Sequence, residues 1–364
     1  MKVAIVCDWL TGIGGAERVV LELHRLYPQA PIYTSQYNPS KLPWFRDADV
    51  RTGWLQSVPA TFRKFLPIFR ILYFSRLNLT KYDLIISSSG AEAKGVHKQT
   101  GAVHICYMHA PTHYYWSRYE SYLQNPGFPR GTNWLAKLGL RLLVAPLRRW
   151  DFRAAQAPDI VVANSTHTQT AIKKYYRRNS VRIFPPVDTK RFSEGSSEPR
   201  RGFVIAGRQT PYKRIDLAVQ ACTQLNVPLT VIGDGPQHSK LVSMAGPTIT
   251  FLTDITDKQI PPYFHLALGF IFPGLDDFGI TPVEAMACGT PVIAFKGGGA
   301  LDYIVLNKTG LFFERQSVAS LVDALQKFTS VKFDHAAIIK HAAKFNVERF
   351  RKEFKQVVNE EKRA

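Results

Sequence analysis

Short runs of apolar residues alternate along the chain with longer segments in which apolar and polar residues recur at helical spacing. The apolar runs predict buried strands at residues 3–7, 84–88, 103–107, 160–163, 203–206, 229–232, 248–252, 268–272 and 291–295. The intervening segments predict helices at residues 16–26, 166–176, 215–224, 257–265, 282–288, 318–328 and 347–361. Strands and helices that alternate in this way predict an α/β fold, in which helices cover both faces of a parallel sheet.

The alternation occurs twice, and a small polar stretch at residues 193–200 separates the two halves as a linker would. The sequence therefore predicts two doubly wound, Rossmann-like domains, residues 1–192 and 201–345, that face a central cleft. Residues 346–364 follow them as a charged C-terminal helix. Ligands of doubly wound sheets bind beyond the carboxyl ends of the strands, so we expect the chemistry in the loops that follow strands.

Composition is that of a globular protein: 45% of the 364 residues are hydrophobic and 21% are charged. The four cysteines lie far apart, which excludes a Cys-x-x-Cys metal or redox motif. The apolar run at the N-terminus is too short for a signal peptide. No run approaches the ~18 residues that span a bilayer. We therefore expect a cytoplasmic protein, either free or peripherally associated with a membrane.

Charge is strongly basic and is concentrated in the first half of the chain. The formal net charge is +19, and residues 1–190 hold 26 of the 47 Lys and Arg but only 11 of the 28 Asp and Glu. This excess indicates an anionic partner, either a phosphorylated ligand or an anionic membrane. No nucleic-acid-binding motif accompanies the charge, so we expect no nucleic-acid partner.

Two segments of the first half interleave basic with large apolar residues. Residues 51–82 hold six basic residues and no acidic one, and residues 134–153 hold five basic residues. Both segments predict contact with an anionic membrane surface, at the inner face of the cell membrane. The alternative interpretation is a pair of amphipathic helices that pack on the core with their Lys and Arg stems extending outward.

A glycine-rich loop follows the first expected strand. Gly12, Gly14 and Gly15 would let backbone N–H groups approach a phosphate or a sugar. The loop lacks the G-x-G-x-x-G fingerprint of dinucleotide-binding proteins, because Glu17 occupies the position of its last glycine. A nicotinamide enzyme is therefore disfavoured, and a tight turn without a ligand is the alternative.

Two cations follow the first strand of the second half. Gly207 and Arg208 end this strand, and Lys213 comes five residues after Arg208. An Arg fork and a Lys point charge at this spacing can converge on one diphosphate. Two solvated surface charges are the alternative interpretation.

The segment 276–284 combines carboxylates with the start of a helix. Gly279 permits close approach to the backbone, and Pro282 suits the first turn of a helix, whose N-terminus favours an anion. Asp276 and Glu284 flank this turn, where their carboxylates can accept hydrogen bonds from sugar hydroxyls. Packing alone does not explain so dense an arrangement.

Together these motifs resemble those of the retaining glycosyltransferases of family 4, which have the GT-B architecture. In the second half the resemblance is carried by Gly207-Arg208 with Lys213, by an E-x7-E-like element from Asp276 to Glu284, and by residues 233–236 and 295–299, with further matches at 164–165 and 185–188. Motifs at 8–10, 14–17, 107–111 and 114–116 resemble mannosyltransferase-like members. The resemblance covers nearly the whole chain and implies the GT-B fold, with the C-terminal helix crossing back to the N-terminal domain.

Catalytic and donor-binding roles follow from the resemblance. Arg208 and Lys213 would neutralise the departing diphosphate. Glu284 would hold the nucleotide ribose, Asp276 would hold hydroxyls of the donor sugar, and His109 would lie near the transferred sugar. The other residues implied to contact the donor are Gly14, Gly15, Gly207, Asp277, Phe278, Gly279 and Ile280.

Acceptor contacts implied by the resemblance are Trp9, His113, Tyr114 and Trp116. Two positions depart from the family's pattern. Asp276 stands where Glu is usual, so its sugar contact needs a shifted sugar or a water, and His113 stands where Arg is expected, which leaves its acceptor role open. A satisfied core histidine at 109 and core aromatics at 9 and 116 are the structural alternatives.

The resemblance thus implies transfer of a hexose with retention, namely mannose from GDP-mannose, onto a lipid-linked glycan such as one on polyprenyl diphosphate. No cofactor is expected besides this sugar nucleotide. No metal is expected either, since the two cations can do its work, and Asp47-Ala48-Asp49 is interpreted as an incidental D-x-D. The alternatives are a UDP-sugar-dependent family 4 transferase with another acceptor and a non-catalytic membrane-docked scaffold.

Overall fold

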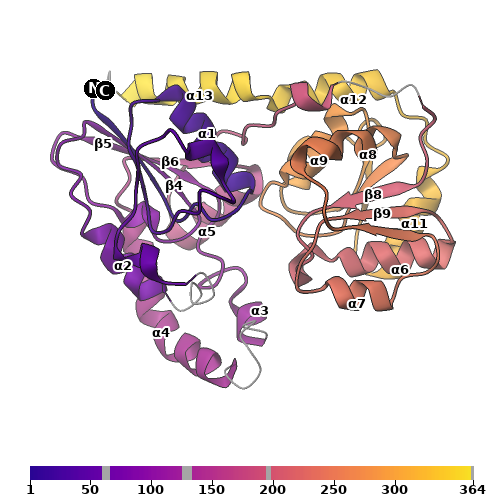
Figure 1. Cartoon of the computed structure of the whole chain (residues 1–364), viewed down its shortest axis with the longest axis horizontal. Helices are drawn as coiled ribbons and strands as arrows, with labels where there is room; N and C mark the ends of the chain where they lie inside the picture. Colours follow the sequence, from indigo (N-terminus) through magenta and orange to yellow (C-terminus); the bar gives the residue numbers. More distant parts are fainter. Residues whose placement is uncertain (60–65, 125–132, 194–197, 362–364) are drawn as a thin grey trace. The chain divides into compact units, whose positions relative to one another are not determined.

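A computed structural model describes residues 1–59, 66–124, 133–193 and 198–361 (Figure 1). The chain forms two compact units. Unit 1 comprises residues 1–184 together with 351–364, and unit 2 comprises residues 185–350. The last helix, α13 (Val347–Glu361), therefore begins in unit 2 and ends in unit 1. In unit 1 its Arg351 pairs with Glu22 of helix α1 at 2.6 Å.

The sheet of unit 1 is parallel throughout and has seven strands in the order β3-β2-β1-β4-β5-β6-β7. Their bounds are β1 Val3–Cys7, β2 Ile32–Thr34, β3 Val50–Arg51, β4 Leu84–Ser89, β5 Val103–Met108, β6 Ile160–Ala163 and β7 Val181–Arg182. The four longest strands were predicted from their apolar runs. β2, β3 and β7 were missed because two or three residues form no recognisable run.

Helices of unit 1 lie between these strands. They are α1 Gly15–Leu26, α2 Pro67–Ser75, α3 Tyr119–Gln124, α4 Asn133–Ala154 and α5 Thr166–Tyr176, with short 3-10 turns at 43–45, 54–57 and 93–95. The Ser165 side chain caps α5 by accepting a hydrogen bond from the Thr168 amide at 2.9 Å. The N-terminal half of α4 extends away from the sheet (Figure 1), so its apolar residues have little of this unit to cover them.

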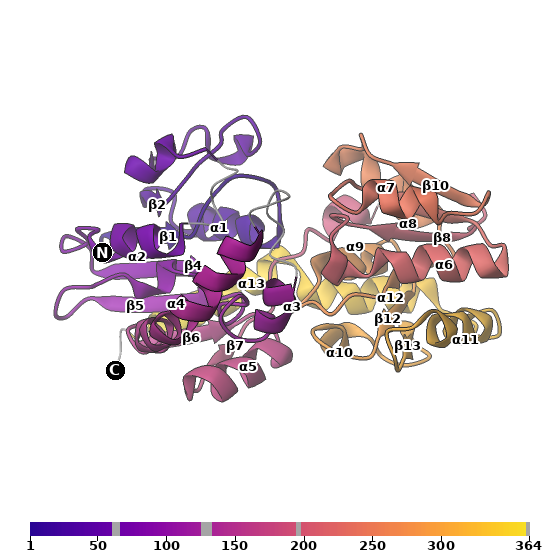
Figure 2. The same ribbon diagram turned by 90° about the horizontal axis from the view of Figure 1, so that it is seen from below.

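The sheet of unit 2 is also parallel, with six strands in the order β10-β9-β8-β11-β12-β13. The strands are β8 Phe203–Ala206, β9 Leu229–Ile232, β10 Ile249–Leu252, β11 Gly269–Phe272, β12 Val292–Phe295 and β13 Gly310–Phe313. The helices are α6 Ile215–Leu225, α7 His238–Ser243, α8 Ile260–Leu266, α9 Ile280–Ala287, α10 Ala300–Tyr303, α11 Val318–Phe328 and α12 His335–Ala342. α6 and α11 pack side by side on the sheet (Figure 2) and contribute to one apolar core.

Both strand orders confirm the predicted doubly wound α/β fold. In each sheet the order reverses at a central pair of strands, β1 beside β4 in unit 1 and β8 beside β11 in unit 2. The loops after such a pair diverge to opposite faces and leave a crevice at the carboxyl edge of the sheet. Those loops carry most of the residues singled out above.

Unit 2 begins earlier than the linker predicted at 193–200, of which residues 194–197 lie outside the described part. The segment from Pro185 onward packs on unit 2. The ring of Phe192 stacks on Phe264 with centroids 5.8 Å apart, and Val187 forms a β-bridge with Asn346. These contacts, invisible in a polar stretch of sequence, place the division before the linker.

Candidate active site

Arg208 and Lys213 follow β8, the central strand of unit 2, and Asp276 follows its neighbour β11. The Gly207 amide donates to the Ile232 carbonyl at 3.0 Å, which continues the strand pairing to the start of the loop. Because parallel strands end at one edge of a sheet, the two loops bring these charged side chains to the same crevice.

Lys213 and Asp276 pair directly with each other in this crevice. Nζ of the lysine bonds to Oδ2 of the aspartate, and both side chains are largely buried. The lysine Nζ also lies 5.7 Å from the centre of the Phe272 ring. Arg208, in contrast, is exposed and has no ion-pair partner among the described residues. The structure thus brings two of the predicted catalytic residues into contact and leaves the third facing solvent.

A backbone hydrogen bond and ring packing hold the turn after Asp276 in place. The Asp276 carbonyl accepts a hydrogen bond from the Gly299 amide at 3.0 Å. The Phe278 ring is buried and meets the rings of Tyr303 and Phe345 with centroids 5.5 and 5.9 Å away. Only the backbone of Phe278 can therefore face a donor, although we expected a donor contact at this residue.

Helix α9 begins directly after this turn. Gly279, its N-cap residue, has φ +85°, a conformation that favours glycine, and no side chain caps the helix. The N–H groups of Ile280 and Thr281 in the first turn can therefore point to an anion, which the helix dipole favours there, whereas Pro282 has no N–H. Asp277 and Ile280 are half-buried beside this turn.

Glu284 lies one turn farther along α9 and is buried. Its Oε1 lies 3.2 Å from Nη2 of Arg191, whose Nη1 bonds to Asp257. Sequence reasoning missed Arg191, although it closely follows the motif at 185–188. The guanidinium holds the carboxylate of Glu284 in a defined orientation, as a ribose-binding group requires.

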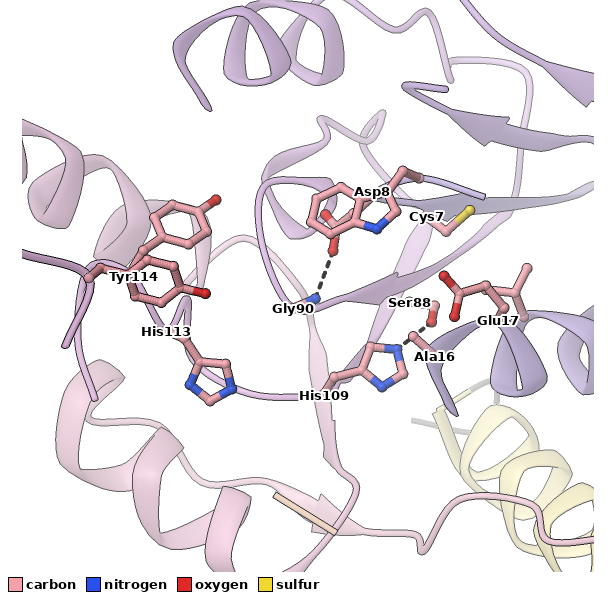
Figure 3. A pocket seen from close by; sticks show the side chains of 12 residues that line it. Cys7, Asp8, Ala16, Glu17, Ser88, Gly90, His109, His113 and Tyr114 are labelled. Carbon is pink, nitrogen blue, oxygen red and sulfur yellow. Dashed lines mark hydrogen bonds between the residues drawn. The ribbon is translucent and has the colours of Figure 1, made fainter. Parts of the chain in front are cut away.

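Unit 1 contains a cavity of about 250 Å³ beyond the ends of β1, β4 and β5 (Figure 3). Its walls include Trp9, Glu17, Ser88, His109, His113 and Tyr114. Tyr114 and His113 lie on one side of the view, and Glu17 and Ala16 lie on the other (Figure 3). The cavity thus gathers His109 and three of the four expected acceptor contacts.

One wall of the cavity is polar. Nε2 of His109 lies 2.8 Å from the Ser88 Oγ, and its ring stands edge-on to Tyr107 with centroids 5.3 Å apart. Gly14 caps helix α1, which begins at Gly15. A Cβ at position 14 would come within 2.7 Å of Oε2 of Glu17. The glycine therefore leaves room for the carboxylate of Glu17 at the cavity.

Asp8 is buried behind this wall, and its carboxylate is fully used in the fold. It accepts backbone N–H groups from Gly90 at 2.8 Å, Ala91 at 3.0 Å and Ala93 at 2.8 Å, and the Ser89 hydroxyl at 3.2 Å. Asp8 therefore shapes the loop after β4. The sequence showed it only as part of a motif, since the residues that it bonds lie more than 80 positions away.

A buried ion pair supports the aromatic walls. Nε of Arg70, in α2, lies 2.7 Å from Oε2 of Glu92, and the two side chains are 4% and 0% exposed. Glu92 also accepts the hydroxyl of Tyr114, and the Arg70 guanidinium lies 5.0 Å from the Trp9 ring. Burial and the Glu92 charge raise the pKa of Tyr114 well above its usual value, which keeps the phenol a hydrogen-bond donor.

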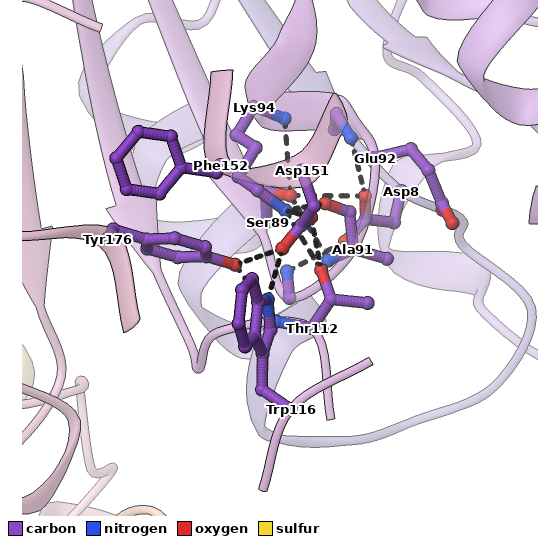
Figure 4. A network of polar contacts seen from close by, with 12 residues as sticks. Asp8, Ser89, Ala91, Glu92, Lys94, Thr112, Trp116, Asp151, Phe152 and Tyr176 are labelled. Atoms are coloured by element: carbon purple, nitrogen blue, oxygen red, sulfur yellow. Dashed lines mark hydrogen bonds and ion pairs between the residues drawn. The ribbon is translucent and has the colours of Figure 1, made fainter. Parts of the chain in front are cut away.

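A second buried pair joins Lys94 and Asp151 at 2.6 Å (Figure 4). Asp151 also accepts the hydroxyls of Thr112 at 2.8 Å and Tyr176 at 2.6 Å, and the indole N–H of Trp116 at 2.7 Å. Trp116 is absent from the cavity walls. The hydrogen bond of the indole to Asp151 agrees with the alternative of a core aromatic, and the acceptor contact of Trp116 stays a prediction.

Neither the Asp47-Ala48-Asp49 triplet nor the four cysteines form a metal site within the described residues. The Asp49 carboxylate of the D-x-D triplet accepts hydrogen bonds from its neighbour Arg51. Within the described residues no three His, Cys, Asp or Glu side chains gather as metal ligands would. In the same ranges no helix combines the length and hydrophobicity that crossing a bilayer requires. All four cysteines are buried and unpaired.

Comparison with known proteins relates the chain to transferases. Residues 186–345 match the family model described as glycosyl transferases group 1. A GDP-mannose-dependent alpha-(1-6)-phosphatidylinositol monomannoside mannosyltransferase of Mycobacterium tuberculosis is 29% identical over 204 residues, which cover 48% of this chain. The chain spans about half the length (53%) of that relative. An alpha-1,3/1,6-mannosyltransferase of Homo sapiens is 24% identical over 370 residues, covering 87% of this chain and 85% of the human protein.

Solved structures resemble the whole chain. HepE of Anabaena in complex with UDP is 17% identical with a TM-score of 0.71, over 99% of this chain and 100% of that one. Sucrose-phosphate synthase of Thermosynechococcus elongatus is 18% identical with a TM-score of 0.73, over 99% of both chains. At these identities the likeness shows the fold, and the GT-B fold predicted from the sequence is confirmed.

Proposed function

We propose that this chain, which has the GT-B fold and matches the glycosyl transferases group 1 model over residues 186–345, is a retaining hexosyltransferase. The donor that we propose is GDP-mannose, and the acceptor is a lipid-linked glycan at the inner face of the cell membrane. The observation that carries the transferase chemistry is the crevice of unit 2. There a solvent-facing Arg208, Lys213 and the uncapped start of α9 supply positive charge beside two carboxylates.

Binding of the sugar nucleotide would rearrange the pair between Lys213 and Asp276. The diphosphate offers the lysine a stronger anion, and Arg208 can join it from the solvent side. Lys213 would then turn to the diphosphate and release the carboxylate of Asp276 to accept donor-sugar hydroxyls. As the bond to the sugar breaks, charge develops on the leaving diphosphate, where these two cations stabilise it most.

Glu284 would bind the ribose hydroxyls of the same nucleotide. Its ion pair with Arg191 holds the carboxylate in one orientation. Retention would follow from attack on the face that the diphosphate leaves, with that diphosphate taking the acceptor's proton. The acceptor would bind in unit 1, in the cavity lined by His109, His113, Tyr114 and Trp9.

Membrane contact is supported by the apolar side chains that unit 1 exposes. Helix α2 buries Arg70, Tyr73 and Phe74 but exposes Phe69 and Ile68. Trp54 stands edge-on to Phe69 with centroids 5.8 Å apart and is itself exposed. Exposed Arg76 and Lys81 follow the helix. Basic and apolar side chains on one surface fit an anionic leaflet, and Arg63 and Lys64 of the same segment lie outside the described residues.

Helix α4 adds a second exposed apolar stretch. Its exposed apolar side chains are Trp134, Leu135, Leu138, Leu142 and Leu143. Basic Arg141 and Arg149 are exposed on the same helix. Helices α2 and α4 each bury some side chains, as the alternative interpretation has it, and the apolar side chains that they leave exposed support the proposed membrane contact.

Choice of donor is the finer part of the proposal. Relatives named as mannosyltransferases in Mycobacterium tuberculosis and Homo sapiens support GDP-mannose. The UDP bound to HepE supports the alternative of a UDP-sugar donor. The cations of the crevice in unit 2 would contact the diphosphate, which GDP and UDP share, and so do not distinguish the two donors.

Calorimetric titration of the purified full chain with GDP, UDP, ADP and NAD, without added metal, tests the proposal. We expect GDP to bind, and Arg208→Ala to abolish the binding while Lys240→Ala, which removes an exposed lysine of α7, leaves it intact. Preferential binding of UDP or ADP would be consistent with the proposed transferase mechanism but would contradict GDP-mannose as the donor. Binding of NAD alone, or of no nucleotide, would overturn the transferase and favour a scaffold.

A further inference from the structure

The cavity of unit 1 differs in charge from the unit around it. Unit 1, residues 1–184 and 351–364, carries 30 Lys and Arg against 13 Asp and Glu. Among the described residues that line the cavity there is no Lys or Arg, whereas two are acidic, Asp8 and Glu17. A strongly basic unit thus encloses a pocket whose described lining holds no Lys or Arg.

This charge pattern selects against a phosphate. A phosphate group brings close to two negative charges at neutral pH. In the cavity it would meet the carboxylate of Glu17, with Asp8 behind it and no guanidinium or ammonium among the lining residues to compensate. A neutral group that donates hydrogen bonds meets no such repulsion.

The lining groups match a neutral sugar ring. Glu17 presents a carboxylate that accepts hydroxyl donors, and Ser88 with His109 adds a second polar contact. Trp9, Tyr114 and Tyr122 supply aromatic faces, against which the C–H face of a pyranose packs. A volume of about 250 Å³ is small and suits one ring rather than an extended glycan.

Glu17 brings a second carboxylate to the cavity wall. The carboxylate oxygens of Asp8 accept hydrogen bonds from the amides of Gly90, Ala91 and Ala93 and from the Ser89 hydroxyl. Glu17 lies in the first turn of α1, where the helix dipole stabilises its negative charge. The absence of a side chain at Gly14 gives that carboxylate its place at the cavity.

We infer that this cavity binds the terminal, uncharged sugar ring of the acceptor, and that Glu17 is a specificity-determining residue that accepts its hydroxyls. The phosphate and lipid of the acceptor stay outside the cavity. An acceptor that offers only a polyprenyl phosphate, with no sugar yet attached, is thereby excluded. The inference rests on the proposed function, since it names the acceptor class of that transferase.

Two matched glycosides test the inference on the full chain, octyl α-D-mannopyranoside and its 6-phosphate. Binding is measured by saturation-transfer NMR and calorimetry without donor, and turnover is then measured with GDP-mannose. We expect the neutral mannoside to bind and to be extended, and the 6-phosphate to bind at least about tenfold more weakly. Equal or tighter binding of the 6-phosphate would overturn the inference.

Variants assign the selectivity to Glu17. Glu17→Gln should weaken mannoside binding about tenfold, because it removes a charged hydrogen-bond acceptor. It should also reduce the difference in affinity between the mannoside and its 6-phosphate. Glu120→Gln, in the first turn of exposed α3, is the matched control and should change neither. Tyr122→Ala should weaken the mannoside several-fold through loss of a stacking face. Thermal melts verify that each variant is folded, and unchanged mannoside binding in folded Glu17→Gln would overturn the assignment.

The experiment separates this inference from the proposed function. If nucleotides bind and GDP-mannose is used but neither Glu17→Gln nor Tyr122→Ala affects the acceptor, only the inference fails. If these variants change the affinity for the donor alone, the cavity holds the donor sugar and the inference fails. If no nucleotide binds while the mannoside does, the proposed transferase fails and the cavity's preference for a neutral sugar stands.

Discussion

The two units share one sheet architecture but bury different kinds of side chain. Unit 2 packs α6 and α11 on its sheet around one apolar cluster. Among its described residues, Glu284 is the one buried side chain of the types Asp, Glu, Lys and Arg. Unit 1 buries many more such residues, namely Asp8, Glu17, Glu22, Arg70, Glu92, Lys94 and Asp151. Its apolar contacts are divided between separate clusters.

The difference shows two ways of building a site on the same fold. Burying a charge costs several kcal/mol unless it is paired and fully hydrogen-bonded. In unit 1 the carboxylate of Asp8 binds the backbone of the loop after β4, and Glu92, paired with Arg70, binds Tyr114 of the cavity wall, so some of the buried charges shape the pocket. Unit 2 keeps its core apolar and places its charges at strand ends. The family model matches residues of unit 2 alone, so the model says nothing about the cavity of unit 1.

Breaking a buried ion pair in unit 1 should have the largest effect. Asp151→Ala leaves Lys94 buried without its carboxylate, and we expect unit 1 to lose about 3–5 kcal/mol. Hydrogen exchange followed by mass spectrometry would locate the loss around residues 91–116. The combined change Lys94→Met and Asp151→Leu should restore most of it, because no charge is then stranded.

The matched change in unit 2 is Leu321→Ala, which removes a fully buried leucine of α11. It should cost about 2–5 kcal/mol and raise exchange in unit 2. An Asp151→Ala variant with unchanged exchange in unit 1 would contradict the claim that buried ions hold that unit together.

Acid should also weaken unit 1 through His104. This imidazole is fully buried, with Nε2 2.8 Å from the Ser87 Oγ, and burial lowers its pKa from 6.5 to about 3. Because the unfolded chain takes up the proton first, the contribution of neutral His104 is complete above pH 6.5 and is lost as the pH falls toward 3. The full window corresponds to a loss on the order of 4 kcal/mol.

Denaturant unfolding between pH 7 and pH 4, monitored by exchange in each unit, measures this loss. His104→Gln should make unit 1 less sensitive to acid in that window. His265 of unit 2 also has a pKa lowered by burial but is less enclosed, so its effect should be smaller. Equal acid sensitivity of unit 1 in the wild type and in His104→Gln would show that protonation of His104 does not cause the loss of stability.

Removing a cation from the crevice of unit 2 should act on catalysis and leave stability unchanged. Arg208→Ala and Lys213→Ala should each lower turnover of GDP-mannose roughly 10²-fold or more, equivalent to about 2.7 kcal/mol of barrier. Lys240→Ala is again the control. Wild-type turnover in both variants would show that the two cations of the crevice do not contribute to catalysis.

Polar changes on the exposed apolar surface should have the smallest effect. Phe69→Asp on α2 should weaken binding to anionic liposomes about tenfold, since the ring is 46% exposed and available to the bilayer. Val242→Asp on α7 of unit 2, equally exposed at 46%, should not change it. Sedimentation at rising salt measures both variants, and wild-type binding that is insensitive to salt would contradict an electrostatic contribution.

Much of the fold was accessible from local pattern. Apolar runs of four or more residues located β1, β6 and β8, and helical spacing located α5 and α11, at the bounds that the structure has. The two-residue strands β3 and β7 escaped, because pairing with a neighbour defines them and their own residues do not. The start of unit 2 escaped for a similar reason, since Phe192 is held there by a distant Phe264.

The candidate site divides in the same way. The sequence by itself determined the strand–loop–helix pattern, the positions of Arg208, Lys213, Asp276 and Glu284 at strand and helix ends, and the basicity of the first half, because these depend on neighbours within a few residues. Only the tertiary structure decided that Lys213 bonds Asp276, that Arg191 holds Glu284, that Trp116 is bonded to Asp151, and that a pocket without cations lies inside a basic unit. These are contacts between residues far apart in the chain. Burial and complementary charge select them, and neither exists until the chain is folded.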